Sequence, residues 1–255
     1  MSGVRLQITA GVAELRLDNP AKLNCFTAAM LAELAAHLEA IDTSADISAV
    51  VVTGEGDRAF CSGADINAWG DLSPVEFANA WVRGGHRLFD RLARLGKPTI
   101  AALNGHAFGG GLELAAACDI RVMVPGATIA LPEAGVGIVP GWSGTQRLAR
   151  LLPEAMVKEM ALFGRRIGAD RALACGFVAE VADDARIAAH AIAAGVAGLS
   201  PRAVEIGKAM LHAGVGEDPA AMIEALGSAA IAGTNDRVEG VAAFRAKRKP
   251  EFPGT

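Results

Sequence analysis

The stretch Lys97–Arg121, KPTIAALNGHAFGGGLELAAACDIR, predicts a strand, a glycine turn and a buried helix. Pro98 to Leu103 is a short β-run, and the three glycines at 109–111 let the backbone turn sharply. Leu112 to Cys118 is a helix that is apolar nearly all round, and such a helix is normally buried. The one acid in it, Glu113, therefore needs a partner or a task.

Upstream of this stretch, the chain shows the same order of strand, glycine-containing loop and helix. Two strands, Val4–Ile8 and Val12–Leu17, precede a helix that Thr27 is predicted to cap. The β-branched run Ile47–Thr53 then leads into the small-residue loop AFCSGAD at 59–65. The unit recurs about every fifty residues without obvious sequence identity, which indicates a structural repeat.

Downstream, the pattern changes from mixed to helical. Ile120–Val124 and Thr128–Leu131 are predicted to be short strands, and a loop rich in Gly and Pro follows them. No strand is predicted after about residue 135, where alanine-rich segments carry helical apolar stripes. We therefore expect an α/β core over residues 1–195 and an all-helical region over residues 196–255.

Composition and charge exclude several classes of partner. The 255 residues carry a formal net charge of −4, so we expect no nucleic-acid and no membrane partner. The start MSGVRLQIT has no apolar signal core, and no apolar run is long enough to span a bilayer, which favours a cytoplasmic location. The cysteines have neither CxxC pairs nor a histidine at ligand spacing, so neither a metal nor a disulfide framework is predicted: Cys25, Cys61, Cys118 and Cys175.

Two acids and two glycine-containing loops are the candidates for catalytic groups and for N–H donors. Glycines that precede a helix present free N–H groups at a positive dipole end, here at Gly110, although a simple tight turn gives the same pattern. Glu113, three residues later, lies on the same helical face. A second acid, Glu133, follows in LPEAGVGIVPG, where a solvated loop acid is the alternative. When two acids share one pocket, their pKa values move apart, so one can act as the acid and the other as the base. The backbone N–H of Ala64 is the second candidate donor to an oxyanion, beside that of Gly110.

Other catalytic motifs fail. GWSGT at 141–145 lacks the final glycine and the preceding strand of a nucleophile elbow, so we expect a structural role for Ser143. Neither GxGxxG after the first strand nor GxxxxGK[ST] is present. His106 lies close to the glycines, but a lone histidine beside a turn is more often packed or hydrogen-bonded than catalytic.

In this order and spacing, the motifs resemble the enoyl-CoA hydratase/isomerase, or crotonase, family from about Leu15 to Phe252. The resemblance implies a crotonase-like spiral of ββα units, followed by a helical trimerisation region, and a homotrimer or a homohexamer built as a dimer of trimers. It also implies an acyl-CoA substrate and no cofactor. The motifs that carry it are NPAKLNCF at 19–26, AFCSGADI at 59–66, NGHAFGGGLELAAACDIR at 104–121 and PEAGVGIVPGWSGTQRL at 132–148.

The resemblance also implies roles for single residues. The thioester oxygen is expected on the N–H groups of Ala64 and Gly110, and the catalytic water between Glu113 and Glu133. This pair implies syn hydration of a trans-2-enoyl-CoA, with Glu113 as the base and Glu133 as the acid. The contacts with substrate and CoA are expected from Lys22, Leu23, Ala64, Asp65, Ile66, Gly109 and Lys247.

Two alternatives remain open at the level of sequence. One is a Δ3,Δ2-enoyl-CoA isomerase that uses Glu133 alone, and the other is a non-catalytic acyl-CoA-binding protein on the same fold. Trp142 and Ser143 stand where hydratases of the family commonly have small residues and glycine, which predicts a reshaped pocket. Phe77 and Trp81, in a helix predicted to start at Ser73, are candidates for the acyl tunnel, although helical aromatic residues are more often plain core.

Overall fold

The computed structural model describes residues 2–216 and 219–255 and divides the chain into two compact units. The first unit is Met1–Val204 and the second is Glu205–Thr255. The division falls a few residues after the predicted boundary between residues 195 and 196. The oligomerisation role given to the C-terminal region stays a prediction.

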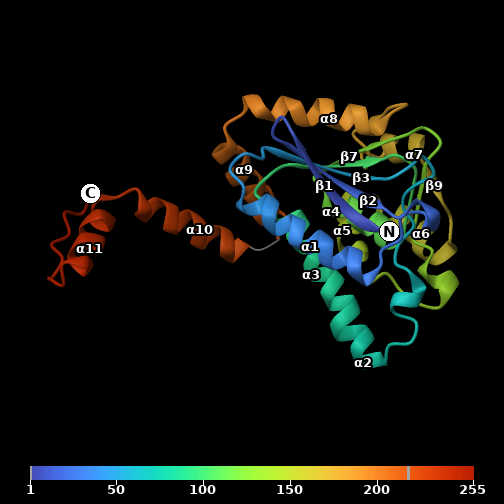
Figure 1. The fold of residues 1–255 in the computed structure, drawn as a ribbon, viewed down its shortest axis with the longest axis horizontal. Helices are drawn as coiled ribbons and strands as arrows, with labels where there is room; N and C mark the ends of the chain where they lie inside the picture. Colours follow the sequence, from blue (N-terminus) through green and yellow to red (C-terminus); the bar gives the residue numbers. More distant parts are fainter. Residues whose placement is uncertain (1, 217–218) are drawn as a thin grey trace. The chain divides into compact units, whose positions relative to one another are not determined.

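The first unit contains two β-sheets with helices packed around them (Figure 1). The strands are β1 (Gly3–Thr9), β2 (Val12–Asp18), β3 (Ala49–Gly54), β4 (Ala59–Cys61), β5 (Thr99–Leu103), β6 (His106–Phe108), β7 (Ile120–Met123), β8 (Thr128–Ala130), β9 (Ile167–Gly168) and β10 (Glu180–Val181). The six-stranded sheet has the order β1-β2-β3-β5-β7-β10, and the four-stranded sheet has the order β4-β6-β8-β9. The pairs β3 and β4, β5 and β6, and β7 and β8 each send one strand to each sheet before a helix follows, which confirms the ββα spiral.

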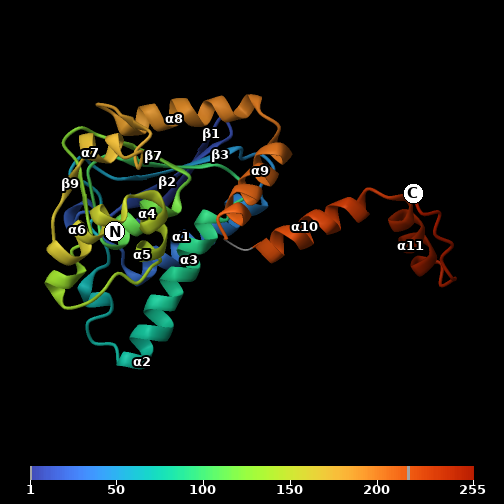
Figure 2. The same cartoon turned by 180° about the vertical axis from the view of Figure 1, so that it is seen from behind.

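Helices cover both faces of the larger sheet (Figures 1 and 2). The helices of the first unit, apart from the start of α9, are α1 (Ala28–Thr43), α2 (Pro74–Glu76), α3 (Arg83–Ala93), α4 (Gly110–Ala117), α5 (Gly144–Leu151), α6 (Glu154–Phe163), α7 (Ala169–Ala174) and α8 (Ala185–Gly195). Val50 and Val52 of β3 pack into the main core with α1 and α3, whereas Ala49 and Val51 pack under α8. Because both faces are covered, β3 is an unbroken apolar run, as buried parallel strands are.

Two strands contradict the prediction that none follows residue 135. β9 pairs antiparallel with β8, and β10 pairs parallel with β7. Each has only two residues, which is too short for alternating polarity to show in sequence; each extends a sheet edge that is already formed. The helices α5 to α8 therefore belong to the α/β unit, in agreement with the predicted core of residues 1–195.

Local signals fix several element ends. Ala10 and Gly11 both have positive φ, of 49° and 79°, which suits the tight turn between β1 and β2. Thr27 caps α1 by accepting a hydrogen bond from the Met30 N–H at 3.2 Å. Ser73 forms the predicted capping box, but the predicted single helix is interrupted by a π-helical segment, Phe77–Val82, before α3 begins.

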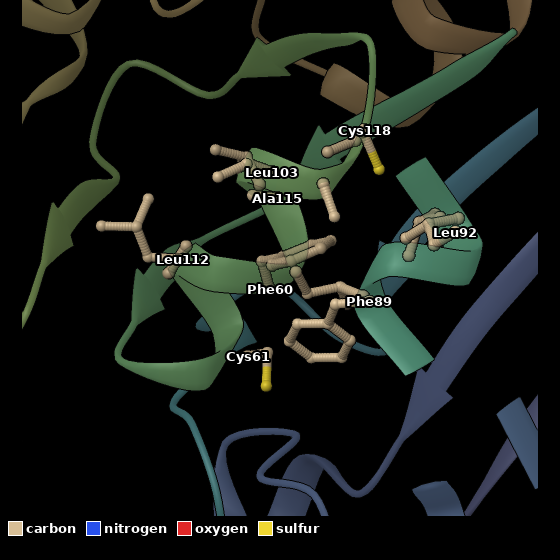
Figure 3. Packing of buried hydrophobic residues seen from close by; sticks show 14 of the residues in the cluster. Phe60, Cys61, Phe89, Leu92, Leu103, Leu112, Ala115 and Cys118 are labelled. Atoms are coloured by element: carbon tan, nitrogen blue, oxygen red, sulfur yellow. The ribbon is translucent and has the colours of Figure 1, made fainter. Parts of the chain in front are cut away.

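The helix α4 lies at the centre of the main core. All eight of its residues are buried. Figure 3 shows Leu112 and Ala115 of α4 together with Phe89 and Leu92 of α3 and Phe60 of β4. Burial of a large apolar side chain contributes about 1.5–3 kcal/mol. These contacts fix the position of α4, and therefore of the N–H groups at its first turn.

A buried carboxylate ties α8 to the sheet on the opposite face. Glu14 of β2 accepts hydrogen bonds from Arg186 and His190 of α8, both at 2.6 Å, and from Arg16. Burial alone would raise the pKa of Glu14, but the hydrogen bonds from Arg186, His190 and Arg16 outweigh it and lower the pKa to about 2. The hydrogen bonds of Glu14 therefore give it a structural role.

The second unit contains α10 (Pro219–Ala232) and α11 (Asn235–Arg245), and α9 (Pro201–Gly214) spans the division between the units. Thr234 caps α11 by accepting from the Arg237 N–H. Apolar side chains are exposed here, and Phe244 is 85% exposed. Within the described residues no single helix has the length and hydropathy to cross a membrane, and one bent pair of helices passes by length and composition only.

Candidate active site

A cavity lies at the N-terminal end of α4, and the predicted reactive groups line it. The cavity has an empty volume of about 740 Å³, its open mouth included. Its polar lining consists of the two glycine loops and the two acids, and the rest is apolar or aromatic. The predicted site residues among its lining are Ala64, Ile66, Gly109, Gly110, Glu113 and Glu133. The geometric expectation that Glu113 and the start of its helix share one cavity is confirmed.

Each of the two candidate N–H donors, Ala64 and Gly110, directly follows a glycine in a backbone conformation that other residues rarely adopt. Gly109, at the N-cap of α4, has φ 51° and ψ −125°, and Gly63 has φ 107°. A Cβ at Gly63 would lie 3.5 Å from the Gly110 nitrogen, so this glycine keeps the approach to that donor open. Among the hydrogen bonds of the described residues, none uses the N–H of Ala64 or Gly110. Both donors are therefore free to bind a substrate oxygen.

Glu113 is buried, with 3% exposure, and it has two backbone partners. Its Oε1 accepts hydrogen bonds from the N–H groups of Trp142 and Gly144, both at 2.8 Å. A Cβ at Gly144 would lie 2.6 Å from the Glu113 Cγ, so the close approach requires glycine. Burial raises the pKa of Glu113, whereas the two N–H donors and Arg147 act in the opposite direction.

Glu133 is also buried, with 7% exposure, but it lacks such support. It opens a 3₁₀-helix, Glu133–Val136, beside the cavity. Its Oε2 has no hydrogen-bond partner among the described residues. Burial, with the nearby charge of Glu113, raises the pKa of Glu133 to about 7, against a smaller lowering effect of its own N–H. A buried acceptor without a partner in a lined cavity indicates a polar ligand such as water.

The cavity walls are aromatic. All three tryptophans of the chain line it, together with Phe77, and the tryptophans are Trp69, Trp81 and Trp142. Trp69 lies against Phe77 with ring centroids 5.5 Å apart, and Trp81 lies against Trp142 at 5.3 Å. The structure thus places Phe77 and Trp81 on the cavity and not in plain core.

The Trp142 side chain forms the part of the cavity wall that lies against Gly110. It is 3% exposed and meets Phe26 and Phe89 edge-on at 6.0 and 5.3 Å. A Cβ at Gly85 would lie 2.2 Å from its Nε1, and one at Gly110 would lie 2.9 Å from its Cε3. The indole occupies the space that these two glycines leave and forms part of the cavity wall; a pocket reshaped relative to other hydratases stays a prediction.

The predicted CoA contacts fall into separate groups. Lys22 Nζ lies 2.8 Å from the Asp65 Oδ2, and the lysine side chain is 56% exposed. Leu23, at φ 53°, lines a second hollow that also contains Arg58. Lys247 follows α11 in the second unit. The contacts of these residues with CoA stay predictions.

Two sets of hydrogen bonds at the site were not predicted from the sequence. The N–H groups of Trp142 and Gly144, which hold Glu113, belong to the GWSGT segment that was set aside as a failed nucleophile motif. The hydrogen bond between Ser143 and His86, which lies on α3, was not predicted either.

His106 is structural: its Nδ1 accepts a hydrogen bond from the Thr128 N–H at 3.1 Å, and its ring stacks on Phe108. No group of three potential metal ligands occurs within residues 2–216 and 219–255.

The ββα spiral, with two unused N–H groups and two buried acids on one cavity, has the features of an enzyme site that stabilises an oxyanion and transfers protons. The model of the enoyl-CoA hydratase/isomerase family matches residues 7–255, and the chain belongs to this family.

Curated and solved proteins agree with this assignment. The short-chain-enoyl-CoA hydratase of Clostridium acetobutylicum is 34% identical over 255 residues, which are 98% of this chain and 97% of that protein. The structure of an enoyl-CoA hydratase from Bacillus anthracis has a TM-score of 0.80 at 33% identity, over 99% of each chain. Pseudomonas aeruginosa DspI has a TM-score of 0.82 at 35% identity, over 98% of this chain and 96% of that chain. The fold is that of the crotonase family, and the protein is an enzyme of the hydratase family.

Proposed function

We propose that the protein is an enoyl-CoA hydratase that adds water syn to a trans-2-enoyl-CoA and yields a 3-hydroxyacyl-CoA. The observation that carries the proposal is the burial of both Glu113 and Glu133 on one cavity, next to the unused N–H groups of Ala64 and Gly110. An isomerase needs one such acid. Two buried carboxylates in one cavity are costly unless both are used.

In the proposed reaction, the thioester oxygen accepts hydrogen bonds from the N–H groups of Ala64 and Gly110. Glu113 removes a proton from water, and the oxygen attacks C3 of the enoyl group. Glu133 gives its proton to C2, and the proton that Glu113 took from water is then passed back to Glu133, so the net reaction adds one water and consumes no other reactant. Negative charge builds on the thioester oxygen during the attack, and one donor of this kind lowers the barrier by about 3 kcal/mol.

The electrostatics of the two acids support this division of work. Glu133, with a pKa of about 7 and an unpartnered oxygen, retains its proton near neutral pH and suits the acid. Burial raises the pKa of Glu113 as well, but its carboxylate accepts two backbone hydrogen bonds that act against this rise, so of the two acids Glu113 has more support for the charged form and suits the base. The pair then carries one proton both before and after the reaction.

One observation favours a second candidate, the Δ3,Δ2-enoyl-CoA isomerase. Because Oε1 of Glu113 is already occupied by two N–H groups, a structural role for Glu113 would leave Glu133 as the only proton carrier. The Glu113→Gln variant separates the two: a hydratase loses activity, whereas a one-acid isomerase retains it.

The direct assay is the loss of enoyl-thioester absorbance when purified protein meets crotonyl-CoA. We expect hydration to 3-hydroxybutyryl-CoA. If crotonyl-CoA is unchanged while a 3-enoyl-CoA is isomerised, the isomerase replaces the hydratase. If neither reacts but acyl-CoA still binds, the protein is a binding protein on this fold.

A homotrimer or homohexamer, a cytoplasmic location and a reaction without a cofactor complete the proposal. Exposed apolar side chains in the second unit, such as Phe244, support self-association. Sedimentation of the full chain measures the assembly.

A further inference from the structure

A chain of polar contacts links α3 to the turn that holds Glu113. The Ser143 hydroxyl and the His86 Nδ1 share a hydrogen bond of 2.8 Å. The His86 Nε2 lies 3.3 Å from the Asp90 Oδ2, and the other oxygen of Asp90 forms an ion pair with Arg147 of α5. Contact of Asp90 with Nε2 favours a proton there, so Nδ1 accepts the hydrogen bond from Ser143.

The order Ser, His, Asp resembles a hydrolytic triad, but the geometry argues against a nucleophile. Gly141 and Trp142 line the cavity, whereas Ser143 does not. Ser143 is 6% exposed, and its hydroxyl bonds to α3. A nucleophile must reach the substrate carbon, so this serine has another role.

The backbone of Ser143 shows what that role is. Ser143 has φ 78° and ψ 8°, which is left-handed backbone that a residue with a Cβ adopts at a cost. In this conformation the N–H groups on either side of it, at Trp142 and Gly144, converge on one oxygen of Glu113. The hydrogen bond to His86 is the side-chain contact that holds Ser143 in place.

We propose that His86 and Ser143 are a positioning pair that holds the turn at 142–144, and through its two N–H groups orients the Glu113 carboxylate. The proposal rests on the proposed hydratase function for its effect on rate. Neither residue lines the cavity, so we expect the pair to act on the rate of the chemical step and not on CoA binding.

The test compares His86→Ala, Ser143→Ala and the double variant His86→Ala with Ser143→Gly. Each alanine variant removes the hydrogen bond and keeps a Cβ on the left-handed residue, so we expect kcat to fall about tenfold, with KM within about twofold. In the double variant glycine adopts the turn without help, so we expect it to recover most of the kcat lost in His86→Ala. Arg87→Ala, an exposed change on the same helix, is the matched control.

Hydrogen–deuterium exchange of the 140–147 segment gives a readout that does not depend on activity. Exchange should be faster in His86→Ala and return towards the wild-type rate in the double variant. Unchanged kcat and exchange in His86→Ala, or a double variant as impaired as His86→Ala, would overturn the proposal. If wild-type protein does not hydrate crotonyl-CoA, the hydratase function fails, and the exchange result alone decides whether the pair holds the turn.

Discussion

Glu14 and Glu133 are both buried carboxylates, and their surroundings are opposite. Glu14 accepts hydrogen bonds from Arg16, Arg186 and His190, and its pKa is lowered to about 2. Glu133 has an oxygen without a partner, and its pKa is raised to about 7. A buried acid that is saturated with partners serves the fold, whereas one left incomplete on a cavity is available for chemistry.

The largest expected effect is on activity. Glu133→Gln keeps the shape of the side chain but cannot deliver a proton, so kcat for crotonyl-CoA hydration should fall about 10²- to 10⁴-fold. Steady-state kinetics at saturating substrate measure it. Glu14→Gln is the matched control, because it changes a buried acid away from the cavity and should leave kcat within about twofold once the folded fraction is corrected. A similar loss in both variants would remove the distinction between the two acids.

The second effect is on stability, and here the roles of the two acids reverse. Glu14→Gln removes the buried anion that pairs with Arg186 and Arg16, and Arg16 then pairs with Glu55 alone, so the free energy of unfolding should fall by about 3 kcal/mol at pH 7. Because the pKa of Glu14 is lowered in the folded state, its contribution is present above about pH 4.5 and is lost as pH falls towards 2. Urea unfolding at pH 7 and pH 3 measures both values.

In the same experiment Glu133→Gln should not destabilise the protein. The pKa of Glu133 is raised in the folded state, so its favourable contribution exists only at low pH and is lost as pH rises through about 7. At pH 8 the glutamine variant should be at least as stable as wild type. A strongly destabilised Glu133→Gln variant would mean that Glu133 is structural.

The pH profile of activity is the third comparison. Hydration needs one proton on the pair of Glu113 and Glu133, so kcat/KM should fall as pH rises through about 7, when the pair loses that proton. Dehydration of 3-hydroxybutyryl-CoA needs the same single proton and should show the same limb. A profile that is flat from pH 6 to 9 in both directions would contradict the assignment of Glu133 as the acid.

The smallest effect concerns the choice of substrate. Trp142→Ala removes the rigid wall beside Gly110 and opens the cavity. The ratio of kcat/KM for a longer 2-enoyl-CoA over crotonyl-CoA should rise about tenfold. Phe89→Ala, which removes a ring that packs on Trp142 outside the cavity lining, should lower stability without changing this ratio.

The sequence predicted those features that depend on neighbouring residues along the chain. The glycine turn before α4 and the acid one turn into it identified one side of the cavity, and the loops that carry Ala64 and Glu133 were candidates for the other side, to which the family resemblance gave roles. The short strands β9 and β10 and the π-helical segment at Phe77–Val82 were missed, since two-residue pairings and helix irregularities leave no periodic pattern. The hydrogen bond between Ser143 and His86 joins residues 57 positions apart, so only the folded chain brings them together.

The different pKa values of the acids were equally beyond the sequence, because they depend on which partners surround each carboxylate. Glu14 and Glu113 both stand in apolar runs, yet cations saturate one and backbone N–H groups hold the other. Burial can be predicted from an apolar pattern, whereas hydrogen-bond partners come from distant elements.

The central claim is that Glu113 and Glu133 together divide a water molecule across the enoyl double bond. Incubation with crotonyl-CoA in ¹⁸O-labelled water and, separately, in D₂O, followed by mass spectrometry, tests it directly. We expect one ¹⁸O at C3 and one deuterium at C2 of 3-hydroxybutyryl-CoA, with neither formed by Glu113→Gln or Glu133→Gln. Unlabelled crotonyl-CoA, together with isomerisation of a 3-enoyl-CoA that survives in Glu113→Gln, would contradict it.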